Sequence, residues 1–334
     1  MSSFAPESAE PLEEVFNNKA PGYAYTRISN PTVAAFENRM NTLEKGVGAV
    51  ACSSGMAAVT MSLRNILEAG DEIICGAGLF GGTIDLFGDL AAFGIKTKFV
   101  KHVTKEEIAP IINSKTKAVF AETISNPAGV VLDSCKFVKL AHEHGVPMIC
   151  DNTFATPINC RPFEFGVDIV THSTTKYMDG HAMALGGAIV DSGNFDWDAH
   201  ADKFPGLTTP DESYHGVIYT QKFGKKAYIT KATAQLMRDM GACQSPQNAF
   251  LTNVGLETLH LRVERHCRNA EKVAEFLKNH PKVAWVEYAG LADSKYHALA
   301  EKYMPNGNCG VLCLGPKGGR DGARHFTNGQ QKEA

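Results

Sequence analysis

Short apolar runs of strand length alternate with longer amphipathic stretches over about the first 190 residues. The expected strands are 49–52, 72–75, 97–100, 118–122, 148–151, 169–172 and 187–190. The expected helices between them are 31–43, 56–68, 82–93, 105–112 and 135–144. Strands separated by helices at this spacing are typical of βαβ units. The pattern therefore predicts an α/β fold with a mostly parallel, buried central sheet that is flanked by helices.

The pattern changes after residue 245. Apolar residues recur at helical spacing from 246 to 280, which predicts one long helix. The stretch from 283 to about 326 has room for a strand or two and a helix, and the polar residues 327–334 are expected to fray. We therefore expect a short N-terminal arm (1–28), a large domain (29–245), and a long connecting helix with a partial, smaller C-terminal α/β domain (246–334).

Composition excludes several classes of function. A net charge of −3 provides no basic field for nucleic acid, and no apolar run approaches the roughly 20 residues that span a bilayer. The nine cysteines are irregularly spaced and include no CxxC pair, which favours reduced thiols over disulfides or a zinc site. Residues 1–10 have neither the positively charged n-region nor the apolar h-region of a secretory signal. A cytoplasmic protein that has no metal, no membrane span and no nucleic-acid partner is expected.

Lys176 carries the strongest chemical signal. It ends the run His172-Ser173-Thr174-Thr175-Lys176, directly after an expected strand. In open α/β sheets, ligands bind at the carboxyl ends of the strands. Neighbouring hydroxyl groups can bind a phosphate, and burial lowers the pKa of such an amine. A lysine chosen at random is usually a solvated surface residue, but this setting favours a lysine that binds pyridoxal 5′-phosphate (PLP) covalently.

Asp151 ends another expected strand. A carboxylate at a buried strand end needs a cationic partner, and the pyridinium nitrogen of PLP is one. The side chain could equally cap a turn or helix. Its position 25 residues before Lys176 favours the cofactor role.

A possible phosphate site lies between the first expected strand and the next helix. There the chain reads Ser53-Ser54-Gly55-Met56. The N–H groups at a helix start attract anions, and Gly55 allows a phosphate to approach closely. An ordinary serine cap explains Ser54 equally well. The interpretation as a phosphate site is favoured only in combination with Lys176.

A glycine motif leaves a different class of enzyme open. Residues 76–81 match G-x-G-x-x-G between a strand and a helix, as in nicotinamide-dependent dehydrogenases. The acidic residue required at the end of the next strand is absent, since that strand runs into Lys101. We expect these glycines to place Phe80 over a flat cofactor ring instead.

Taken together, these motifs resemble the Cys/Met-metabolism PLP-dependent enzymes of the cystathionine synthase and lyase type, which have fold type I. The resemblance runs from about residue 22 to about residue 326. Within the family, 211–216 and 246–266 look most like the O-acetylhomoserine sulfhydrylase branch. The motifs that carry the resemblance are Tyr25-Thr26-Arg27, Ser54-Gly55-Met56, Phe80-Gly81-Gly82-Thr83, Glu122-Thr123, Asn126-Pro127, Asp151-Asn152-Thr153 and Ser173-x-Thr175-Lys176.

The resemblance implies a role for each matching residue. Lys176 would bind PLP and move protons, and Asp151 would bind the ring nitrogen. Tyr25 and Arg27 would reach the phosphate of a neighbouring subunit's cofactor, so a homodimer is the minimum unit and a homotetramer is expected; Tyr25 is also a catalytic candidate. The remaining cofactor-binding candidates are Ser54, Gly55, Met56, Phe80, Asn126, Thr153, Ser173 and Thr175.

The implied reaction is γ-replacement on O-acetylhomoserine by sulfide or a small thiol, which gives homocysteine or methionine and acetate. It would belong to sulfur metabolism and methionine biosynthesis. Elimination of the methionine γ-lyase type and cystathionine γ-synthesis use the same groups and remain open.

The sequence also departs from the family. Phe80 replaces a frequent tyrosine, the arm is short, and the arginine that binds the substrate carboxylate has no counterpart after Phe326. A truncated subunit that binds PLP but turns over weakly, or a purely structural subunit, is therefore a further alternative.

Overall fold

The computed structural model describes residues 1–6, 8–16, 20, 22–76, 78–101 and 105–329. A seven-stranded sheet forms its centre. The strands are β1 (Gly48–Cys52), β2 (Glu72–Gly76), β3 (Lys96–Val100), β4 (Thr116–Glu122), β5 (Met148–Asp151), β6 (Ile169–Ser173) and β7 (Gly187–Asp191). Each expected strand is present within two residues of its predicted bounds.

The strand order is β1-β7-β6-β5-β4-β2-β3. β7 pairs antiparallel with both β1 and β6, and the other pairs are parallel. The prediction of a mostly parallel sheet is therefore confirmed. Because β1 and β6 are both antiparallel to β7, all strands except β7 end at the same edge of the sheet.

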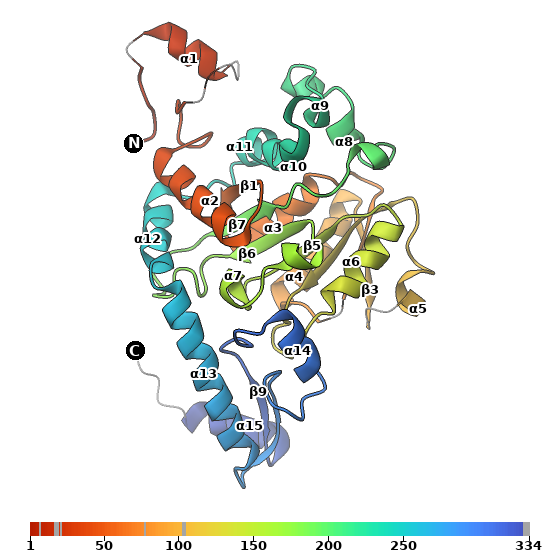
Figure 1. The fold of residues 1–334 in the computed structure, drawn as a ribbon, viewed down its shortest axis with the longest axis vertical. Helices are drawn as coiled ribbons and strands as arrows, with labels where there is room; N and C mark the ends of the chain where they lie inside the picture. The colour runs from red at the N-terminus through yellow and green to blue at the C-terminus, as the bar shows by residue number, and fades with distance from the viewer. Residues whose placement is uncertain (7, 17–19, 21, 77, 102–104, 330–334) are drawn as a thin grey trace.

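Helices cover both faces of the sheet (Figure 1). One apolar cluster joins α3 (Gly55–Arg64) and α4 (Gly81–Asp89) to the sheet. Two others join α6 (Ser134–Glu143), α2 (Pro31–Glu44) and α12 (Pro246–Leu256) to the opposite face. Ile73 belongs to the first cluster and Ile74 to the second, as expected when successive side chains of a strand point to opposite faces. The described α-helices between residues 31 and 240 are α2 (Pro31–Glu44), α3 (Gly55–Arg64), α4 (Gly81–Asp89), α5 (Lys105–Ile108), α6 (Ser134–Glu143), α7 (Thr156–Asn159), α8 (Pro205–Thr208), α9 (Tyr219–Phe223), α10 (Ala227–Lys231) and α11 (Arg238–Met240).

Polar caps fix the starts of the two helices nearest β1. Asn30 accepts hydrogen bonds from the N–H groups of Thr32 and Val33, and Pro31 occupies the first turn of α2. Ser54 caps α3 through the N–H of Ala57, at 3.1 Å. The start of α3 is thus held immediately after β1.

β1 is an edge strand, and a side chain of α2 binds one of the backbone N–H groups on its open side. The Glu37 carboxylate accepts a hydrogen bond from the N–H of Ala51, at 2.8 Å. Burial raises the pKa of Glu37 to about 7. An acid of the adjoining helix that occupies a backbone N–H group of the edge strand discourages pairing with a further strand.

The prediction of one long helix at 246–280 is wrong, because the structure has two helices there. α12 (Pro246–Leu256) and α13 (Leu259–Lys278) are separated at Glu257 and Thr258. At this break the Arg262 guanidinium donates to the Gly255 carbonyl and to the Tyr177 carbonyl, both at 2.6 Å. The break therefore holds the backbone just after Lys176.

The C-terminal part contains an antiparallel pair, β8 (Val283–Glu287) and β9 (Cys313–Pro316), with α14 (His297–Tyr303) and α15 (Gly319–Gly329). The predicted strand or two is confirmed, but there are two helices instead of one. Fraying was expected from residue 327, whereas α15 continues to Gly329; residues 330–334 lie outside the described residues. The apolar side chains of Leu261, Val273 and Phe276 on α13 are exposed.

The N-terminal helix α1 (Ala9–Phe16) projects away from the body of the domain (Figure 1). Within the described ranges, no helix has the length and apolar character needed to cross a membrane.

Candidate functional site

The carboxyl ends of the strands surround a cavity of about 280 Å³. Its size is near the lower end of the range for small-molecule sites. It lies at the edge of the sheet where α/β proteins bind ligands. Ten of the predicted site residues line it: Ser54, Gly55, Met56, Phe80, Asn126, Asp151, Thr153, Ser173, Thr175 and Lys176.

Lys176 lies in the turn that follows β6. Its side chain is exposed, so the expectation that it is buried is wrong. The reason is that it reaches from a turn into an open cavity instead of lying between the layers. Among the described residues that line the cavity, Lys176 is the sole lysine or arginine.

One side of the cavity has the features of an anion site. The N-terminus of α3 opens onto it, and a side chain at Gly55 would come within 2.5 Å of the Ser173 Cβ. Only glycine leaves this approach free. Thr175 lines the same region, but its hydroxyl exchanges hydrogen bonds with the backbone of Gly186, at 3.1 and 3.2 Å. Exposed helix N–H groups and nearby hydroxyls suit a phosphate.

The Asp151 carboxylate at the wall of the cavity is fixed by two hydrogen bonds. It accepts hydrogen bonds from the N–H of Thr153, at 3.0 Å, and from the Thr171 hydroxyl, at 3.1 Å. The Thr153 hydroxyl in turn accepts from the N–H of Ser173, at 2.8 Å. These bonds lock the end of β5 to the end of β6, so the carboxylate has one orientation.

Glu122 is a residue of the site that the sequence reasoning named only within a motif. It is the register partner of Asp151 on β4. Its carboxyl oxygens accept from the N–H groups of Phe80, at 2.6 Å, and Asn126, at 3.2 Å. Burial, together with the charge of Asp151, raises the pKa of Glu122 to about 8. Its position at the carboxyl end of an expected strand was the signal that could have identified it.

A buried polar network supports the ends of β5 and β6 from below. His172 Nε2 lies 2.5 Å from Glu44 Oε1, and neither side chain is exposed. The Asn152 amide donates to the same Glu44 oxygen, at 3.0 Å, and accepts from the Thr123 hydroxyl, at 2.8 Å. The residues adjoining Asp151 and Ser173 are thereby tied to the end of α2.

Tyr25 and Arg27 do not line the cavity of their own chain. The Arg27 guanidinium donates to the Arg238 carbonyl and lies 5.4 Å from the centroid of the Tyr25 ring. Tyr25 is 41% exposed. Of the twelve predicted site residues, these two are the ones that the single chain leaves outside the site.

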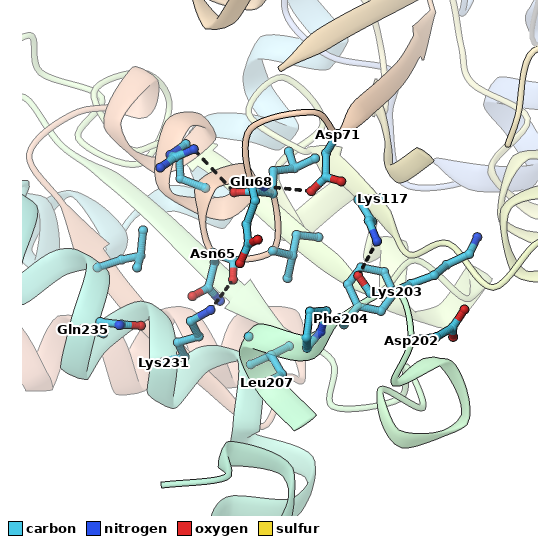
Figure 2. Close-up of a pocket in the computed structure, with 16 residues that line it drawn as sticks. Asn65, Glu68, Asp71, Lys117, Asp202, Lys203, Phe204, Leu207, Lys231 and Gln235 are labelled. Carbon is cyan, nitrogen blue, oxygen red and sulfur yellow. Dashed lines mark hydrogen bonds between the residues drawn. The ribbon is translucent and has the colours of Figure 1, made fainter. Parts of the chain in front are cut away.

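A second cavity, of about 250 Å³, lies at the opposite end of α3 (Figure 2). Its lysines are already engaged with backbone: Lys231 donates to the Asn65 carbonyl, at 3.1 Å, and Lys117 to the Lys203 carbonyl, at 2.6 Å. The cavity is lined by lysines and also by the carboxylates of Glu68 and Asp71, so both signs of charge are present. None of the predicted site residues lines it, so it does not compete as the cofactor site.

The first cavity fits PLP on the chemistry of its walls. An anion cradle, an amine and two neighbouring carboxylates face one space. The mutual repulsion of Glu122 and Asp151 would be relieved by a cation such as a pyridinium. The model of the family described as Cys/Met metabolism PLP-dependent enzyme matches residues 1–331. The chain belongs to this family.

Curated relatives and solved structures agree with this assignment. The homocysteine/cysteine synthase of Saccharomyces cerevisiae is 43% identical over 318 residues, which cover 95% of this chain and 72% of the yeast protein. The O-acetyl-L-homoserine sulfhydrylase of Leptospira meyeri is 41% identical and covers 98% of this chain and 76% of its own. The structure of an O-acetylhomoserine (thiol)-lyase from Campylobacter jejuni, which contains a pyridoxyl-lysine phosphate, aligns with a TM-score of 0.91. That structure is 36% identical and covers 95% of this chain and 79% of its own.

These comparisons decide between the alternatives for the enzyme class. PLP dependence and fold type I are confirmed, and the nicotinamide-dependent dehydrogenase alternative is wrong. In the part of the glycine motif that the structure describes, Phe80 lies at the wall of the cavity, 46% exposed. Ala77 of that motif lies outside the described residues.

Proposed function

We propose that this chain catalyses γ-replacement on O-acetylhomoserine, in which sulfide or a small thiol displaces acetate and gives homocysteine or methionine. The observation that carries the proposal is the cavity that Lys176, Asp151 and the start of α3 line together. Relatives above 40% identity carry the names homocysteine synthase and O-acetyl-L-homoserine sulfhydrylase, which favours this branch of the family.

The residues divide the work of the reaction. When bound, PLP supplies an electron sink that acidifies the substrate Cα–H. The Lys176 amine would accept the Cα proton and, at the end of the reaction, return one. Asp151 would hold a proton at the ring nitrogen, and the α3 N-terminus with Ser54 and Ser173 would hold the phosphate. Phe80 would stack on the ring and keep water from one face. Asn126 would lie near the ring oxygen and the substrate carboxylate.

Steady-state assays test the proposal against its neighbours. With O-acetylhomoserine and sulfide we expect equimolar homocysteine and acetate. Release of 2-oxobutanoate and ammonia from methionine would instead assign the chain to elimination. Efficient turnover only with cysteine would indicate cystathionine synthesis. Protein that binds PLP fully but turns over none of these substrates would support the structural-subunit alternative.

We further propose that the site is shared between two subunits of a homodimer, or of a homotetramer built from such dimers. Support comes from Tyr25 and Arg27, which stay outside their own cavity, and from the projecting arm around α1 (Figure 1). In this arrangement Arg27 would pair with a phosphate across the boundary. A cytoplasmic location is proposed as well, since all nine cysteines are free thiols. The division into an arm, a PLP-binding domain (29–245) and a C-terminal part (246–334) remains a proposal.

Arg27→Ala is expected to weaken cofactor retention, and a mixing experiment locates its site of action. If Arg27 acts across the boundary, a hybrid of an Arg27→Ala subunit and a Lys176→Ala subunit contains one intact site. Random mixing should then restore about a quarter of wild-type activity, although each variant alone has little. No recovery in hybrids that size-exclusion chromatography shows to be assembled would place Arg27 in the site of its own chain.

A further inference from the structure

Two cysteines far apart in the sequence meet beside the cofactor cavity. Cys52, the last residue of β1, forms an isolated antiparallel β-bridge with Cys243. Both side chains belong to the same apolar cluster, Cys52 in its buried core and Cys243 packed against it. Cys52 has no exposed surface, whereas Cys243 is partly exposed.

The backbone hydrogen bond next to the bridge defines its type. The N–H of Ser53 donates to the carbonyl of Ala242, at 2.8 Å. A bond from the residue after one partner to the residue before the other identifies a non-hydrogen-bonded antiparallel pair. In such pairs the Cα atoms are about 4.5 Å apart and the side chains are at their closest. Disulfides have Cα separations of roughly 4.4–6.8 Å, and the typical separation of this pair type lies within that range, near its lower end.

We propose that Cys52 and Cys243 are a reversible oxidation site that forms a disulfide when the protein meets a peroxide. The Cys243 thiol would lose its proton, and the thiolate would attack hydrogen peroxide, which gives a sulfenic acid and hydroxide. The hydroxide takes up the released proton and becomes the first water molecule. The Cys52 thiol would then displace hydroxide from that sulfur, which forms the S–S bond and releases a second water molecule. Two thiols are thereby oxidised by two electrons, and a dithiol reductant reverses the reaction.

Burial sets the order of the two steps. Burial, with smaller contributions from Glu37 and Cys243, raises the pKa of the Cys52 thiol well above its ordinary value. Cys52 alone is therefore an inert buried thiol, and the first attack falls to its more exposed partner. Disulfides in the cytoplasm are typically transient and redox-sensing, which agrees with a bond that forms only under oxidative load.

The bond would act on the cofactor site, because both cysteines adjoin it. Cys52 is followed by the turn that leads to Ser54 and Gly55 at the start of α3. Cys243 is followed by Gln244, which is 2% exposed and packs so closely that a side chain on Gly186 would come within 2.5 Å of its amide. The disulfide would fasten these two segments together and close a loop of about 190 residues. We expect it to stabilise the phosphate cradle in its present conformation, even without cofactor.

Peroxide treatment of the purified protein tests the proposal, with peptide mapping under non-reducing conditions as the readout. We expect a Cys52–Cys243 linked peptide, the loss of two titratable thiols, and a rise of several degrees in the Tm of the apoprotein that dithiothreitol reverses. Cys243→Ser should abolish all three changes. Cys135→Ser, which removes an exposed thiol, is the matched control and should leave them intact.

The wild-type peptide map alone can overturn the proposal, so it does not depend on whether a variant folds. Oxidised wild-type protein that carries only other disulfides, or cysteines oxidised to sulfinic acid without any Cys52–Cys243 link, would contradict it. A linked peptide without a change in Tm would also contradict the proposed effect on the cradle. These outcomes are independent of the substrate assays, which test the proposed function separately.

Discussion

Replacement of Lys176 by alanine is expected to abolish covalent attachment of PLP and all turnover, while the fold is retained. The side chain is exposed in a turn and contributes little packing, so its removal should leave the stability nearly unchanged. No other lysine or arginine is found among the described residues that line the cavity, so no neighbouring amine can replace it. Borohydride reduction followed by peptide mapping should find a phosphopyridoxyl label on Lys176 in the wild type and no label in the variant.

A matched variant separates this effect from the general loss of a surface charge. Lys139→Ala removes an exposed lysine of α6 and should keep both the label and the activity. A label on any lysine other than Lys176 in the wild-type protein would contradict the assignment, whatever the activity of the variants.

The sheet was predictable from the sequence because each of its strands is a short run with a distinct apolar pattern. Six of the seven strands have most of their residues buried, and such runs leave little ambiguity when glycines and caps bound them. The helix starts at Asn30 and Ser54 have ordinary capping residues, so their local preferences agree with the final fold.

The segment 205–240 was not predicted. There the structure has short helices, and α10 and α11 are joined by a π-helical stretch, Ala232–Met237. Helices of three to six residues are held by tertiary packing and have no clear period of their own. The break between α12 and α13 escaped prediction for a related reason. Arg262, which stabilises the break, bonds to Tyr177, 85 residues away in sequence, and no local pattern reports such a contact.

The candidate site was predictable where chemistry and strand ends coincide. Asp151 ends a buried strand and Lys176 follows another, and the parallel topology brings these ends to one edge. Glu122 also ends a strand, but its raised pKa arises from the neighbouring Asp151 and from burial, which depend on the strand order. The β-bridge between Cys52 and Cys243 joins segments far apart in sequence and could not be read from spacing.

Asp151→Asn is expected to keep covalent PLP but to slow removal of the substrate α-hydrogen about a hundredfold. The carboxylate would stabilise positive charge at the ring nitrogen, and a neutral amide cannot do so. Electrostatic contributions of this kind are worth about 3 kcal/mol of barrier, which corresponds to roughly a hundredfold in rate. Exchange of the substrate α-hydrogen with solvent deuterium, followed by NMR, measures the step directly. An unchanged exchange rate would rule out the proposed role.

Two further measurements test whether the negative charge of Asp151, and not its hydrogen bonding, is responsible. Thr171→Val removes one hydrogen bond to the carboxylate but keeps its charge, so it should slow exchange by less than tenfold.

The stability of the apoprotein supplies the second measurement. The pKa of Glu122 is raised from 4.5 to about 8, so Glu122 stabilises the folded protein fully only below about pH 4.5. The free energy of unfolding therefore falls as the pH rises from there through about 8. Asp151 accounts for part of this shift, so in Asp151→Asn the free energy of unfolding should fall less between about pH 6 and about pH 8.5 than it does in the wild type. Urea unfolding of both apoproteins at the two pH values gives the comparison, and equal losses would mean that the two carboxylates do not interact.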